Sequence, residues 1–174
     1  MIVNLIFFIF LSVASLMSLS GYGVLLNQKN KKDYLLNIIF GYLILAFLVT
    51  IIHFLFKINF IIIICIFLTG LFINLKNHDY NFKNIEKKNY LYFVIFLILI
   101  PIYISQKYHE DFGYYHLPYI INFTNEKIIF GLGNVNNGFI HNSIWLNILS
   151  VFYIKNNFSF VTLPSFLIYF TFLH

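Results

Sequence analysis

The sequence predicts an all-α, polytopic integral membrane protein with about six transmembrane helices and an extracytoplasmic loop of short interfacial helices. Three observations lead to this fold class. Of the 174 residues, 60% are hydrophobic and only 10% are charged, whereas an average soluble domain is about 25% charged. The mean hydropathy is +0.83. The apolar residues also gather in runs close to the ~20 residues that span a bilayer. A water-soluble monomer and a disordered chain are both excluded.

Six apolar runs are expected to cross the membrane, because each approaches the roughly 17–25 residues that a spanning helix needs. The fifth and sixth runs are shorter and contain polar residues. The first run lacks a basic start and exceeds the ~7–15 apolar residues of a signal peptide, so a retained helix is favoured over a cleaved signal. The runs cover residues 1–26, 34–56, 58–75, 90–105, 138–154 and 158–173.

The lysines predict the orientation. All 11 basic residues are Lys, and cytoplasmic loops carry an excess of Lys and Arg. With six spans, eight Lys fall on one side and three on the other (Lys57, Lys107 and Lys127), so residues 106–137 face outside. The expected organisation is four helices in 1–105, an outer loop in 106–137 and two further helices in 138–174. The basic residues lie between apolar runs, which indicates a lipid bilayer as partner and no nucleic acid.

Polar chemistry is concentrated in residues 106–145, which hold three of the six acidic residues, three of the six His and the single Trp. Apolar residues at helical spacing between Tyr114 and Phe123 predict a helix in the membrane interface. Residues 130–138 are rich in turn formers. Asn142 or Ser143 is expected to cap the next helix.

The adjacent carboxylates Glu110 and Asp111 are the first candidate site. They can bind a divalent cation such as Mg²⁺ or Mn²⁺, or one can act as a general base, with His116 beside them. The alternative is an exposed acidic turn without chemistry, and spacing alone favours it. A transition-metal set including His109 and His141 matches no standard signature. His53, inside the second run, is expected to serve helix packing rather than a proton relay.

One pattern in this segment resembles a group of multi-spanning bacterial membrane proteins. It is roughly D-x-x-x-Y-H-L-P, G-L-x-N and N-S-x-W, over about 40 residues. Asp111 begins it, Tyr115 and His116 follow, and Asn134, Asn142 and Trp145 complete it. That group is similar, more distantly, to GT-C-type membrane glycosyltransferases, which take sugars from polyprenyl-phosphate carriers.

This resemblance implies an inner-membrane enzyme of bacterial envelope glycan assembly that transfers a sugar to a glycan acceptor. It implies catalytic roles for Asp111, Glu110 and His116, and substrate binding by Tyr115, Asn134, Asn142 and Trp145. The chain departs from the GT-C pattern in two ways. In those enzymes the acidic loop usually follows the first helix, whereas here it follows the fourth, and the sequence stops within an apolar run. A fragment of a longer protein is therefore expected. A non-catalytic membrane subunit and a lipid-linked glycan transporter module are the competing functions.

Overall fold

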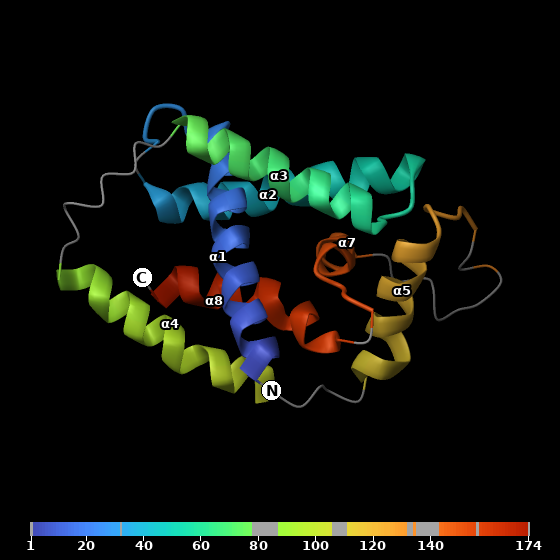
Figure 1. Ribbon diagram of the computed structural model, residues 1–174. Helices are drawn as coiled ribbons and strands as arrows, with labels where there is room; N and C mark the ends of the chain where they lie inside the picture. Colours follow the sequence, from blue (N-terminus) through green and yellow to red (C-terminus); the bar gives the residue numbers. More distant parts are fainter. Residues whose placement is uncertain are drawn as a thin grey trace.

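The computed structural model describes residues 2–31, 33–77, 87–105, 111–131, 134, 143–155 and 157–173. Within this part of the chain the regular structure is helical, and the only β-type pairing is an isolated bridge between Ile154 and Asn157. The all-α prediction is therefore confirmed. Figure 1 shows the helices packed around α1, with α5 and α7 gathered at one end.

Among the described residues, three helices are long and apolar enough to cross a membrane. They are α1 (Ile2–Val24), α2 (Tyr34–Leu55) and α3 (Phe60–Asn77). At 1.5 Å per residue, the 22 residues of α2 cover about 33 Å, close to the ~30 Å of a bilayer core. Their outward faces carry large apolar side chains that are more than half exposed, as expected for lipid contact. Examples are Phe10, Phe47, Ile61, Leu68 and Phe72.

The other helices contain shorter apolar segments, and six spans are not seen in the described part of the chain. Helix α4 (Lys87–Ser105) has 19 residues and contains Pro101. The expected fifth span, residues 138–154, holds only the eight-residue α7 (Ile144–Val151) in its described part, about 12 Å long. The expected sixth forms a 3₁₀ turn, η4 (Phe158–Thr162), and the 11-residue α8 (Leu163–Leu173).

Helix α7 is short and enclosed by protein rather than lipid. Its residues from Leu146 to Val151 are all buried, and it packs against α2 and α5. Its hydrophobicity therefore serves the protein core. An apolar run has the same hydropathy whether protein or lipid covers it, which is why the sequence predicted a span here.

Close backbone approach holds α1 against α2 and α3. A Cβ added at Gly41 would overlap the backbone oxygen of Leu19, and one at Gly21 would overlap that of Gly70. Small residues allow such contacts between membrane helices, where dispersion replaces the hydrophobic effect as the main attraction. The buried Ser15 and Ser18 extend the small-residue face of α1.

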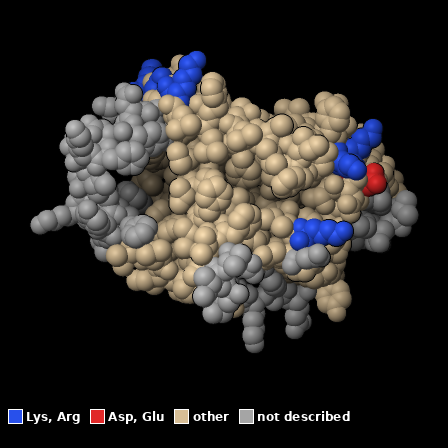
Figure 2. Space-filling model, viewed as in Figure 1, with Lys and Arg blue, Asp and Glu red and all other residues tan. Residues whose placement is uncertain are grey.

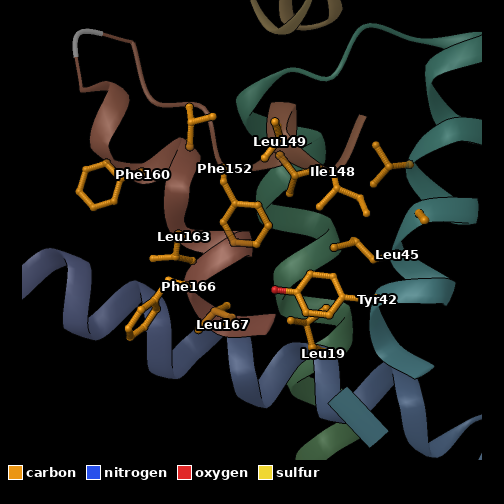
Figure 3. Packing of buried hydrophobic residues seen from close by; sticks show 14 of the residues in the cluster. Leu19, Tyr42, Leu45, Ile148, Leu149, Phe152, Phe160, Leu163, Phe166 and Leu167 are labelled. Carbon is orange, nitrogen blue, oxygen red and sulfur yellow. The ribbon is translucent and has the colours of Figure 1, made fainter. Parts of the chain in front are cut away.

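A cluster of buried side chains joins the long helices to α7 and α8. In Figure 3, Leu19, Tyr42 and Leu45 face residues of α7 and α8. The Tyr42 hydroxyl donates to the Pro164 carbonyl at 3.0 Å. The ring of Phe96, from α4, lies 5.3 Å from that of Phe166. The C-terminal segment is thus part of the same core as the spanning helices.

On the face that Figure 2 shows, the described lysine side chains gather at two opposite ends of the molecule. Figure 2 shows them at the upper left and at the right, with an uncharged surface between. The right-hand end corresponds in Figure 1 to the α2–α3 turn and α5. This distribution is typical of a protein that crosses a bilayer, because charged groups remain at its two surfaces. Together with the three long helices, it indicates a membrane protein.

Candidate functional site

A pocket at the α5–α7 end brings together four of the seven residues predicted for the site. Its volume is about 290 Å³, near the lower limit of the ~300–1,000 Å³ of small-molecule sites. Asp111, Tyr115, His116 and Trp145 line it, so residues 34 positions apart in the chain meet at one surface. The other lining residues are Tyr119, Ser143 and Leu146.

A π-helical turn arranges the first group of lining residues. The turn, η2 (Phe112–His116), follows Asp111 directly and continues into α5 (Leu117–Asn125). Asp111, which precedes the turn, lines the pocket together with Tyr115 and His116 of the turn. Such turns inside helices are frequent at functional sites. A helix is present where one was predicted, and its Ile120 and Phe123 are buried.

The start of α7 supplies a second wall, formed by Ser143, Trp145 and Leu146. Ser143 caps this helix, since its side-chain oxygen accepts a hydrogen bond from the Trp145 backbone N–H at 3.2 Å. Ser143 was one of the two predicted caps. Trp145 is half-buried and Leu146 is buried, so this wall combines an aromatic residue with an apolar one.

Of the other predicted residues, Asn134 belongs to the described part of the chain and does not line this pocket. Asn134 is exposed, and its backbone N–H donates to the Gly131 carbonyl at 2.9 Å. Gly131 has a φ of 79°, so the predicted tight turn is present and this position favours glycine. Glu110 and Asn142 lie outside the described residues. So do His109 and His141 of the transition-metal hypothesis.

Metal binding would involve Asp111 and His116 among the pocket residues. They offer one carboxylate and one imidazole, donors that suit a divalent cation. In the described part of the chain, no three His, Cys, Asp or Glu side chains cluster to form a metal site. The pocket as described therefore provides two of the ligands that such a site needs.

His53 connects the two walls, and sequence reasoning missed its partners. Its side chain is fully buried in α2. Its Nδ1 lies 3.0 Å from the side-chain oxygen of Asn147 in α7. Its Nε2 lies 3.1 Å from the carbonyl of Glu126, at the end of α5. The ring also contacts Phe123, with centroids 4.4 Å apart. One side chain thus fixes both pocket-lining helices to α2.

Further hydrogen bonds complete this junction. The His53 carbonyl accepts from the Ile128 backbone N–H at 3.0 Å. The Asn147 amide donates to the Thr50 hydroxyl at 3.3 Å. Polar residues inside apolar helices tend to pair with one another. The position of His53 and of Asn147 within apolar runs therefore indicated that each has a polar partner. Their separation of 94 residues hid the pairing.

Comparison with known proteins gives a family without an assigned activity. The family model described as "Domain of unknown function (DUF8201)" matches residues 1–174. No curated protein and no solved structure matches the chain. The chain therefore belongs to the DUF8201 family of domains of unknown function.

Proposed function

We propose that this protein is a glycosyltransferase-like membrane protein that takes a sugar from a polyprenyl-phosphate carrier. The supporting observation is the pocket itself, in which Asp111 and His116 meet the ring of Trp145 beside the membrane-spanning helices. Ligand pockets commonly combine aromatic walls with a few polar groups that orient the ligand. The volume of about 290 Å³ suits a group of the size of one sugar ring.

The proposed chemistry assigns a role to each side chain. The Asp111 carboxylate takes the proton of an acceptor hydroxyl, whose oxygen then bonds to the anomeric carbon. The bond from that carbon to the carrier phosphate breaks, and the phosphate leaves with the electron pair. His116 donates a hydrogen bond to the phosphate, while Tyr115 and Trp145 pack against the sugar. A divalent cation at Asp111, with Glu110, would supply further neutralisation of the phosphate charge.

The orientation belongs to the same proposal. Lys57 and Lys155 line one pocket, so they lie on one side of the membrane, whereas six spans would separate them. When Lys155 is assigned to the same side of the membrane as Lys57, the 11 Lys divide seven against four between the two sides, instead of eight against three. The side with more lysines is still the side of the loops at 25–33 and 76–88. The pocket then faces outside a bacterial inner membrane, where lipid-linked sugars are used.

Substitution of Asp111 tests the catalytic role. Asp111→Asn keeps the shape of the side chain and removes its basicity, so transfer from a polyprenyl-phosphate hexose in membranes should fall by about 10²–10⁴-fold. Glu126→Gln is the matched control, because this exposed carboxylate does not line the pocket. Normal transfer by Asp111→Asn, with both variants inserted equally, would refute the role.

Substrate binding can be measured separately from transfer. Trp145 is the single Trp of the chain and lines the pocket, so its fluorescence reports on that site alone. A short-chain polyprenyl-phosphate hexose should change the emission with saturation, and Tyr115→Ala should weaken the response. An unchanged emission at saturating ligand would speak for a non-catalytic subunit.

A further inference from the structure

A second pocket lies at the same end of the long helices and has a different character. Its volume is about 580 Å³. Lys57, from the α2–α3 turn, and Lys155, from the turn after α7, both line it, together with the polar Asn59 and Asn125. We name it the lysine pocket. None of its described lining residues is acidic, so its charge is positive.

The N-terminus of α3 adds to this positive potential. Asn59 caps the helix, since its side-chain oxygen accepts from the Ile62 backbone N–H at 3.0 Å. Phe60, the first residue of this 18-residue helix, lines the pocket. The first turn of a helix carries unpaired N–H groups and a partial positive charge, which favours anions. Two lysines and a helix end therefore meet at one opening.

The remaining walls are apolar and reach the surface that faces lipid. Phe7, Ile63 and Ile121 line the pocket with Phe60, whose side chain is 73% exposed. Phe7 lies near the start of α1, and Phe60 begins α3, so the pocket sits where two spanning helices end. This is the depth of the lipid headgroups. A ligand here can place a charged head against lysine and a hydrocarbon chain along phenylalanine.

The loops that carry the two lysines are held in place by backbone hydrogen bonds. The Ile58 N–H donates to the Phe123 carbonyl at 2.9 Å, which ties the α2–α3 turn to α5. The Asn157 N–H donates to the Ile154 carbonyl at 2.9 Å and closes the turn around Lys155. The two cations are thus presented by preformed turns. Preformed sites lose less entropy when a ligand binds.

We propose that the lysine pocket binds the phosphate head of an anionic membrane lipid, with an acyl chain lying along Phe60. The site is separate from the pocket at Asp111, although α5 contributes to both, and it does not depend on the proposed transfer reaction. The apolar walls and the exposed Phe60 favour a lipid over free phosphate, which would use only the basic part of the site.

Lipid binding by the full chain in detergent tests this proposal. Native mass spectrometry would compare phosphatidylglycerol, which is anionic, with phosphatidylcholine, which is not. Each lysine near a membrane surface contributes a factor of about five to binding, so Lys57→Gln/Lys155→Gln should weaken phosphatidylglycerol binding by about 25-fold. The matched control, Lys29→Gln/Lys127→Gln, removes the same charge away from the pocket and should bind as the parent does.

Several results would overturn the proposal. Equal binding of both lipids would remove the phosphate specificity, and equal loss in the two double variants would reduce the effect to overall charge. Inorganic phosphate that binds as tightly as phosphatidylglycerol would exclude the lipid assignment. Lys57→Arg/Lys155→Arg keeps both charges, so retained binding by this variant would support the site and a loss would contradict it.

Discussion

The His53 junction allows a local prediction about the segment after α5. His53→Leu keeps a side chain of similar bulk but removes the hydrogen bonds to Asn147 and to the Glu126 carbonyl. Hydrogen bonds inside membrane proteins contribute about 0.6 kcal/mol on average and up to about 1.7. His53→Leu removes two such bonds, and water cannot replace the bond to Asn147, which is only 2% exposed. The loss should be about 1–3 kcal/mol.

Trypsin can measure this loss, since Lys127 is an exposed cleavage site between Glu126 and Ile128. Both of these neighbours are hydrogen-bonded to His53. Cleavage that follows local opening tracks the opening equilibrium, so 1–3 kcal/mol corresponds to about 5- to 150-fold faster cleavage after Lys127. Cleavage after Lys29, at the other end of the molecule, is the internal control.

A conservative variant sharpens the test. In His53→Gln the amide can still donate to the Glu126 carbonyl, so cleavage after Lys127 should stay near the parent rate. Equal cleavage rates for the parent and His53→Leu would refute the reasoning. Faster cleavage at Lys127 and Lys29 together would show general destabilisation instead of a local junction.

Two further predictions concern helix packing and sidedness. Gly41→Ala should lower the unfolding temperature in detergent, because overpacking costs about 1–3 kcal/mol and the new Cβ meets the Leu19 backbone; Gly113→Ala, with nothing within 4 Å, should not. Equal unfolding temperatures for the two variants would contradict the packing account. In a chain lacking its native cysteine, Lys155→Cys should react with an impermeant thiol reagent outside intact cells and Lys29→Cys only after lysis. Labelling of both without lysis would contradict the separation of these loops by membrane.

Much of the fold follows from short-range properties of the sequence. The length of an apolar run is set by the bilayer, which made α1, α2 and α3 predictable. Ser143 was recognisable as a cap because capping depends on residues within one turn. His116 was predicted to lie near Asp111 because only five positions separate them in the sequence.

The sequence by itself determined that the chain is a helical membrane protein, and that three of its six acidic residues, three of its six His and its single Trp lie between residues 106 and 145. Only the tertiary structure decided that α7 is a short helix enclosed by protein, that Trp145 and Asp111 line the same pocket, and that the His53 side chain lies within hydrogen-bond distance of Asn147. Hydropathy records how apolar a segment is, not whether lipid or protein covers it. Contacts between residues 34 and 94 positions apart depend on how the helices pack, and no local pattern encodes them.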